Sequence, residues 1–423
     1  MSHAKSSRAV GPALLVALIL ILVVVPGAWA ASKYKTLTKF THTKDGKSPL
    51  ASLIFDRAGN LYGTTFVGGW PAKNDGTVFK LTPNQDGSWT ESVLYRFCSR
   101  RDCRDGARPY AGLVFDQAGN LYGTTADGGG IDDHGVVFKL TPNPDGSWTE
   151  SVLHRFCSLR NCADGYTPYG GLIFDQTGNL YGTTGGGGAH NNGTVFKLAE
   201  NQDGSWSQSV LYSFCSLTNC ADGGGPEATL VFDQVGNLYG TTNGGGRKNG
   251  GTVFKLTPNQ DGSWTEKVLH DFCTFPCHDD GQGPHAAVIL DGAGNLYGTT
   301  FEGGAHEAGV VFQLTPNADG SWTERVLHNF CSRSNCSDGG NSEAGLIFDA
   351  SGNLYGTTLY GGEYYFSLGV VFKLAPNAKG GWTETVLHTF LGNPGSYPYG
   401  GLIFDGVGNL YGTTFNTVFR ITP

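Results

Sequence analysis

The sequence predicts an all-β fold: a single seven-bladed β-propeller with four antiparallel strands in each blade. The first observation is that the pentapeptide LYGTT occurs seven times, starting at positions 61, 121, 180, 238, 296, 354 and 410. The second is that each copy lies in a unit of about 58 residues with four short β-prone runs, which is the pattern of a propeller blade. The third is that the last unit lacks its fourth run, while a matching run precedes the first unit.

The unit around the second LYGTT shows how the strands of one blade are predicted. Its runs are rich in Val, Phe, Tyr, Thr and Trp, which favour strands. The first two runs are joined by a turn that ends at Gly119, since Gly can take a positive φ. The last two are joined by the hairpin signal Asp145-Gly146. The predicted strands, termed a to d, span residues 112–116, 120–125, 136–142 and 147–156.

The two ends of the repeat array predict how the ring closes. The last copy stops after strand c, at Thr417–Pro423. The segment Lys35–Phe40 aligns with strand d of the other units and leads into strand a of the first copy. If Tyr34–Phe40 completes the seventh blade, no long sheet edge is left exposed. We therefore predict that Tyr34–Phe40 is the fourth strand of the last blade.

The start of the chain has the composition of a signal peptide. Lys5 and Arg8 are followed by an apolar run at residues 13–25 and by the small residues of Ala28-Trp29-Ala30. A run of 13 residues is short for a bilayer core of ~30 Å. We therefore expect cleavage, with an uncleaved anchor as the alternative.

The predicted organisation is a signal peptide at residues 1–30 and one propeller at residues 31–423. The mature protein is expected to be secreted to the periplasm or the extracellular space, without membrane attachment after cleavage, as a monomer. The formal net charge of −8 argues against nucleic acid, whose phosphates need a basic face, and against anionic lipid.

The ten cysteines form five local pairs, which indicates disulfides that pin loops. A zinc site would need two pairs to converge, whereas these pairs recur about 58 residues apart, once in each repeat. Disulfides are the expected state of such pairs in an exported chain. The predicted bonds are Cys98–Cys103, Cys157–Cys162, Cys215–Cys220, Cys273–Cys277 and Cys331–Cys336.

No cofactor is expected. The repeated Asp-Gly after the second Cys, as in Asp164-Gly165, offers carboxylates that would suit Ca²⁺. A loop-capping turn is the preferred interpretation of these aspartates. The tryptophans of strand d, and the aspartates that close strand a, are interpreted as scaffold for the same reason: they recur in nearly every blade.

The repeated NLYGTT…GTVFKLTP…W unit resembles the choice-of-anchor tandem repeat GloVer proteins. The resemblance covers nearly all of the chain after residue 30. It implies an exported bacterial repeat protein, and it brings no established activity and no catalytic residues. Members of that family often end in an anchoring segment, and this sequence has none, so surface attachment is not expected.

Residues that differ from blade to blade mark the candidate site, because function is carried by variable positions on a rigid scaffold. One such position lies three residues before the first apolar residue of each strand a, where the chain enters the central channel. Around the ring it reads Tyr399, Leu50, Tyr110 and Tyr169, an aromatic arc, and then Glu227, His285 and Glu343. The loops between strands b and c vary as well, and they carry Trp70, His134, His190, Arg247, His306, Tyr364 and Tyr365.

Three functions are compatible with this pattern. The preferred one is a secreted, non-enzymatic module that binds a carbohydrate or peptide at the channel mouth or variable loops, since aromatic faces beside carboxylates suit a sugar. The second is an extracellular glycan lyase or hydrolase, with Glu227, His285 and Glu343 as acid, base or metal ligands. The third is a purely structural envelope protein. The sequence shows no GxSxG, HExxH or P-loop signature in a usable context, which disfavours the second. The first is preferred because a varied, disulfide-stiffened face lies on an invariant scaffold.

Overall fold

The structure, a computed structural model, describes Met1 and residues 32–423, apart from residues 42–44, 70–74, 132, 274–275 and 364–366. The chain divides into two units, Met1–Ala31 and Ser32–Pro423, and only the second is described below. The predicted signal peptide lies outside the described residues, except for Met1. In the part of the chain that is described, no helix has the length and apolar character needed to cross a bilayer.

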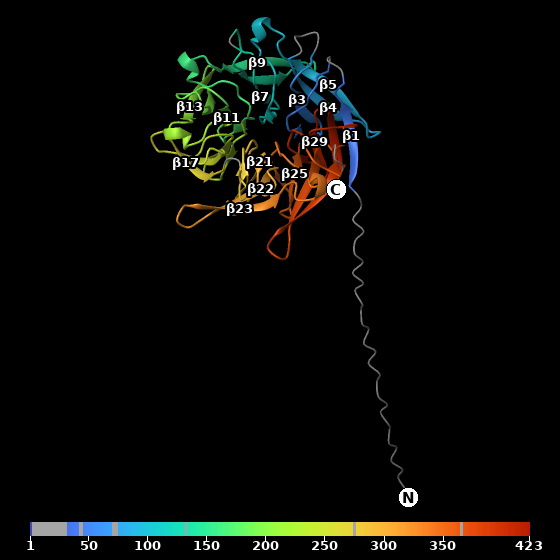
Figure 1. Ribbon diagram of the computed structural model, residues 1–423. Helices are drawn as coiled ribbons and strands as arrows, with labels where there is room; N and C mark the ends of the chain where they lie inside the picture. Colours follow the sequence, from blue (N-terminus) through green and yellow to red (C-terminus); the bar gives the residue numbers. More distant parts are fainter. Residues whose placement is uncertain (2–31, 42–44, 70–74, 132, 274–275, 364–366) are drawn as a thin grey trace. The chain divides into compact units, whose positions relative to one another are not determined.

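Seven four-stranded antiparallel sheets form a ring, one sheet from each repeat, as predicted (Figure 1). Blades 1 to 3 are β2 (Ile54–Phe55), β3 (Leu61–Thr65), β4 (Thr77–Pro83), β5 (Trp89–Arg96); β6 (Val114–Phe115), β7 (Leu121–Thr125), β8 (Val136–Pro142), β9 (Trp148–Arg155); and β10 (Ile173–Phe174), β11 (Leu180–Thr184), β12 (Thr194–Glu200), β13 (Trp206–Ser213).

Blades 4 to 6 follow the same order, from strand a to strand d. They are β14 (Val231–Phe232), β15 (Leu238–Thr242), β16 (Thr252–Pro258), β17 (Trp264–Asp271); β19 (Ile289–Leu290), β20 (Leu296–Thr299), β22 (Val310–Pro316), β23 (Trp322–Asn329); and β24 (Ile347–Phe348), β25 (Leu354–Thr358), β26 (Val370–Pro376), β27 (Trp382–Thr389). A small extra sheet pairs β18 (Gly281–Gln282) with β21 (Glu302–Gly303).

The seventh blade combines both ends of the propeller unit. It contains β28 (Ile403–Phe404), β29 (Leu410–Thr413), β30 (Thr417–Thr422) and the N-terminal β1 (Lys33–Lys39). β1 pairs antiparallel with β30, from Lys33 opposite Thr422 to Lys39 opposite Thr417. The colours of Figure 1 therefore run once around the ring, and blue β1 lies beside the red strands. The predicted closure is confirmed, with the strand boundaries shifted by one residue.

Strand a is shorter than the sequence suggests. In the second blade the expected strand spans residues 112–116, but only Val114 and Phe115 pair with β7. The residues before them, including Ala111 and Gly112, line the central channel instead. The chain thus runs along the channel wall first and joins the sheet only at Val114.

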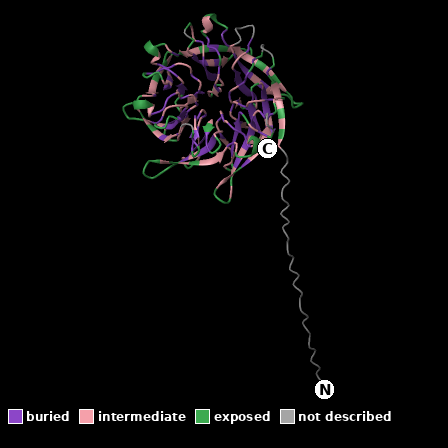
Figure 2. Cartoon of the chain, viewed as in Figure 1, coloured by how far each residue is buried: buried purple, intermediate pink, exposed green. Residues whose placement is uncertain are grey.

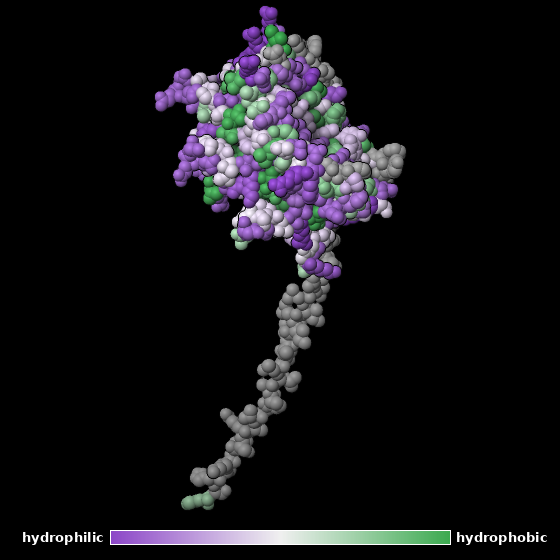
Figure 3. Space-filling model, turned by 60° about the vertical axis from the view of Figure 1, so that its left-hand side comes forward, coloured by the Kyte–Doolittle hydropathy of each residue, from purple (hydrophilic) through white to green (hydrophobic). Residues whose placement is uncertain are grey.

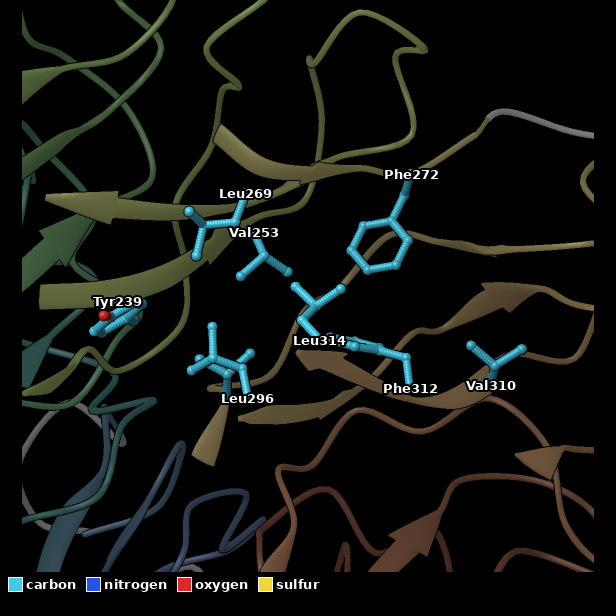
Figure 4. Packing of buried hydrophobic residues seen from close by; sticks show 9 residues of the cluster. Tyr239, Val253, Leu269, Phe272, Leu296, Val310, Phe312 and Leu314 are labelled. Atoms are coloured by element: carbon cyan, nitrogen blue, oxygen red, sulfur yellow. The ribbon is translucent and has the colours of Figure 1, made fainter. Parts of the chain in front are cut away.

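The hydrophobic core lies between neighbouring blades rather than inside one sheet. In one cluster, Tyr239 and Val253 from blade 4 pack on Leu296, Phe312 and other apolar residues of blade 5 (Figure 4). Seven such clusters occur around the ring. Figure 2 shows the buried residues within the blades and exposed ones at the hairpin tips. On the face shown in Figure 3, hydrophilic residues surround smaller hydrophobic areas.

The repeated scaffold residues have the roles expected of them. The strand d tryptophans pack against these clusters, as Trp148 does beside Tyr62 of the preceding blade. The aspartate that closes strand a holds its own turn. Asp56 accepts hydrogen bonds from the N–H groups of Ala58 and Asn60 and from the Tyr62 hydroxyl.

Candidate functional site at the channel mouth

The seven variable residues predicted at the channel entrance surround one cavity of about 310 Å³, which we call the rim cavity. Its lining consists of Leu50, Tyr110, Tyr169, Glu227, His285, Glu343 and Tyr399. Each comes from a different blade, and each is half-buried. A second pocket of the same volume is lined by the same seven residues and by the residues that follow them in each blade, which are mainly Ala and Gly. The structure thus brings together every residue that the sequence selected for this position.

Hydrogen bonds between blades hold the rim residues in place. In six blades the first Thr of LYGTT donates its hydroxyl to the carbonyl next to a rim residue of the following blade, at 3.0–3.1 Å. The pairs are Thr64–Ala111, Thr124–Gly170, Thr183–Ala228, Thr241–Ala286, Thr299–Ala344 and Thr413–Ala51. In the sixth blade Thr357 reaches the carbonyl of Pro398, just before Tyr399. These Thr side chains are buried, so the rim is fixed by the scaffold.

Three tyrosines of the aromatic arc, Tyr399, Tyr110 and Tyr169, line the cavity. The rings of Tyr110 and Tyr169 meet edge to face, with centroids 5.3 Å apart. Phe66 meets Tyr110 from the other side at 6.0 Å. Burial raises the pKa of the Tyr110 phenol, and the charges of Glu343 and Glu227 raise it further. The Tyr110 hydroxyl therefore stays neutral and is available as a hydrogen-bond donor.

The opposite arc contains a charged pair. His285 Nδ1 lies 2.9 Å from Glu343 Oε2, so the ring N–H donates to the carboxylate. The imidazole also stacks on Phe301, with an interplanar angle of 5°. Burial acts to lower the pKa of His285, but its hydrogen bond to Glu343 and the charges of Glu343 and Glu227 outweigh that effect and raise it. The pair therefore favours imidazolium and carboxylate.

Glu227 completes this arc without a strong counter-charge. It accepts a hydrogen bond from the Asn243 amide, and it forms no ion pair with any described residue. Burial raises the pKa of Glu227, while the charge of His285 and the Asn243 hydrogen bond oppose the rise only in part. None of the seven described residues around the cavity is Lys or Arg.

The three ionisable rim residues do not form a compact metal site. Among the described residues, two groups place His, Cys or Asp ligand atoms within 4.8 Å of one another, and neither includes Glu227, His285 or Glu343. Both groups contain cysteines that are bonded to each other, Cys157–Cys162 and Cys98–Cys103. A disulfide has no thiolate to offer a metal.

The five predicted disulfides are all present in the structure. In four loops the second Cys ends a 3-10 turn: Arg101–Cys103, Arg160–Cys162, Thr218–Cys220 and Ser334–Cys336. The following Asp caps the loop. Asp164 is fully buried and accepts hydrogen bonds from the N–H groups of Ser158 and Leu159 and from the Ser158 hydroxyl. These contacts support the loop-capping interpretation over the calcium one.

The b–c loop residues that the sequence singled out and the structure describes do not line the rim cavity. His134, His190, Arg247 and His306 are absent from its lining. Arg247 instead lines a separate surface pocket of about 350 Å³ beside the third disulfide loop. Trp70, Tyr364 and Tyr365 lie outside the described residues.

The residue directly after each LYGTT differs between blades, and three of these residues support the rim through their side chains. Sequence reasoning did not select them. Phe66 packs on Tyr110, Asn243 bonds to Glu227, and Phe301 stacks on His285. The signal was available, since this position reads F, A, G, N, F, L and F along the chain.

The closed ring and its rim cavity define the chain as a seven-bladed propeller protein with a built pocket at the mouth of its channel. The chain belongs to the Gloeobacter/Verrucomicrobia repeat family. The model of that repeat matches residues 28–230, 99–278, 151–335 and 236–423, which together span nearly the whole sequence. The resemblance noted in the repeat unit is thereby confirmed.

Solved structures agree on the fold. The chain is similar to a structure of streptogramin B lyase, with 12% identity and a TM-score of 0.53, over 93% of this chain and 99% of that one. It is also similar to the extracellular domain of a hybrid two-component system from B. thetaiotaomicron, with 12% identity and a TM-score of 0.53, over 93% of this chain and 41% of that one. At this identity the likeness concerns the fold alone. No curated protein matches the sequence.

Proposed function

We propose that the chain is an exported, non-enzymatic propeller that binds a carbohydrate in the rim cavity. The observation that carries this proposal is that the scaffold residues repeat in nearly every blade, whereas the one position that lines the cavity varies from blade to blade. Tyr faces can stack on the C–H surface of a sugar, and carboxylates can accept its hydroxyl protons. The rim offers both around one cavity, with Tyr169 beside Glu227 and Tyr110 against Tyr169.

Export is part of the proposal. Five disulfides each close a single loop that connects one blade to the next, and such bonds persist in oxidising compartments. The apolar segment near the start of the sequence supports the same location.

A glycan array followed by calorimetry tests the binding proposal. The full chain should bind at least one glycan class, and the double variant Glu227→Ala/Tyr169→Ala should bind it at least about tenfold more weakly, since two polar or stacking contacts are lost. His190→Ala, on an exposed b–c loop, is the matched control and should bind normally. Equal affinity of the double variant would contradict the proposal. Binding of peptides but of no glycan would replace the carbohydrate with a peptide ligand.

One contact favours a second candidate, an enzyme that transfers a proton. His285 is held by Glu343 at 2.9 Å, and a carboxylate that orients an imidazole is a common arrangement in acid–base catalysis. Product release from a bound glycan that stops in His285→Gln, with binding retained, would favour the enzyme.

A further inference from the structure

The charges around the rim cavity are unevenly balanced. His285 and Glu343 neutralise each other across 2.9 Å. Leu50 and the three tyrosines carry no charge at neutral pH. Glu227 is therefore the one charged group of the lining that has no partner of opposite charge within ion-pair distance among the described residues.

The surroundings of Glu227 keep it partly away from water without supplying a cation. Its hydrogen-bond partner is the neutral amide of Asn243. The charge of His285 reaches it, but the imidazole has its closer partner in Glu343. A half-buried carboxylate without a counter-ion is costly, and burial accordingly raises the pKa of Glu227.

An aromatic ring stands beside this carboxylate. A Cβ atom added to Gly185 would lie 3.4 Å from Tyr169 Cδ2 and 3.5 Å from Glu227 Oε1. The ring and the carboxylate are therefore neighbours on the cavity wall, next to a glycine that adds no side chain. A carboxylate next to an aromatic face suits a cation, because an ammonium group is attracted by both.

We infer that the ligand of the rim cavity carries a protonated amine, as an amino sugar does, and that its ammonium group binds Glu227 while its ring face lies on Tyr169. This inference rests on the proposed function and narrows it. The lining offers no Lys or Arg to an anionic sugar, so acidic glycans are disfavoured. A neutral sugar would leave the Glu227 charge without a partner.

Two oligosaccharides that carry either a charged amine or a neutral acetamide on the same carbon test the inference. Glucosamine oligomers carry ammonium groups, and N-acetylglucosamine oligomers of equal length do not. Calorimetry on the full chain, expressed with export so that the disulfides form, should show roughly 10- to 100-fold tighter binding of the glucosamine oligomer, the range for one charge-assisted hydrogen bond in a partly desolvated site. Glu227→Gln should remove this preference.

The controls separate the two proposals. Glu302→Gln makes the same change at an exposed carboxylate close enough to His285 to influence it, and it should keep the preference. Asn243→Asp, which adds a carboxylate beside Glu227, should increase it. Equal binding of both oligomers, or an unchanged preference in Glu227→Gln, would overturn the inference and leave carbohydrate binding intact. Failure of the chain to bind any glycan would instead count against the proposed function.

Discussion

Glutamates on the outermost strands differ in whether the preceding disulfide loop provides an arginine that pairs with them. Glu150 in β9 forms an ion pair with Arg100 at 2.8 Å, and Glu384 in β27 forms one with Arg333 at 2.6 Å. Both arginines lie two residues after the first Cys of the preceding disulfide loop. The loop therefore supplies the cation that the next blade needs.

The two loops that carry Leu at this position show what happens without the cation. The loop with Leu159 precedes the blade in which the glutamate is replaced by Gln208. The loop with Leu217 precedes Glu266, which has no ion pair among the described residues. Burial and the charges of Asp222 and Asp271 raise the pKa of Glu266 to about 8. Glu266 is thus protonated at neutral pH in the folded protein.

Glu266→Gln should stabilise the propeller at pH 8 by about 1 kcal/mol, since a neutral amide replaces a group that resists ionisation. The folded state keeps the Glu266 proton up to about pH 8, while the unfolded chain releases it near the ordinary glutamate pKa of 4.5. Stability therefore falls as the pH rises through this window, and the gain should vanish near pH 4. Thermal unfolding at both pH values measures it.

Glu150→Gln is the matched comparison, because Arg100 pairs with this carboxylate and burial raises the pKa of Glu150 only to about 7. Since the change also removes the ion pair with Arg100, it should stabilise the propeller at pH 8 less than Glu266→Gln does. A gain as large as that of Glu266→Gln would show that the missing cation is not the cause.

At the scale of elements, the joint between β1 and the rest of the ring depends on aromatic packing. Tyr34 stacks on His388 of β27 at 4.0 Å with an interplanar angle of 8°. It also contacts Phe390 and Phe419. In the blades with a disulfide loop, the residue equivalent to His388 is a His or Tyr that contacts the capping Asp, as His154 contacts Asp164. The sixth blade has no such loop, and its His packs on the closing strand instead.

Acid should weaken this joint. Burial lowers the pKa of His388 to about 4, whereas the unfolded chain takes up the proton near the ordinary histidine pKa of 6.5. Stability is therefore present above pH 6.5 and falls as the pH drops toward 4. His388→Tyr, which copies Tyr95 and Tyr212 of other blades, should remove about 1–2 kcal/mol of this loss, less than the full shift because the ring is only half-buried.

Chemical denaturation at pH 7 and pH 4.5 measures the effect. His190→Tyr changes an exposed histidine and serves as the control. Its stability should depend on pH as that of the parent chain does. If His388→Tyr loses as much stability in acid as the parent does, another group causes the loss.

For the whole molecule, the number of blades and the closure followed from the repeat, because every blade has to offer the same surface to the next. The position of the rim residues followed from the same register. Their chemistry did not, because pairs such as His285–Glu343 join blades that the sequence places 58 residues apart. The packing of Phe301 on His285 also depends on side-chain directions that a strand pattern does not contain.

The length of strand a was the main error of the fold prediction. Gly112 and Leu113 have strand-like neighbours in the sequence, yet only Val114 and Phe115 pair with β7. Near the axis, strand a has a partner strand on one side only. The residues before Val114 line the channel instead of extending the strand. Local propensity does not predict this shortening.

Ring closure by β1 can be tested on the whole molecule. Deletion of residues 32–40 removes the partner of β30 and leaves an exposed strand edge. It also removes Phe40, which is buried in the cluster between blades 7 and 1. Loss of one buried Phe alone costs about 3–5 kcal/mol, so the deletion variant should unfold at a clearly lower temperature and aggregate.

If ring closure depends on the pairing of β1 with β30 and not on the position of β1 in the sequence, a permuted chain should also close. If residues 32–40 are moved behind Pro423 through a short flexible linker, the same strand can return to β30 from the other end. The permuted chain should regain the thermal stability and the glycan affinity of the parent, measured by calorimetry. The rim supports this expectation, since Thr413 of blade 7 holds the carbonyl of Ala51 beside Leu50 across the closing joint. A deletion variant as stable as the parent would show that six complete blades and a three-stranded seventh suffice.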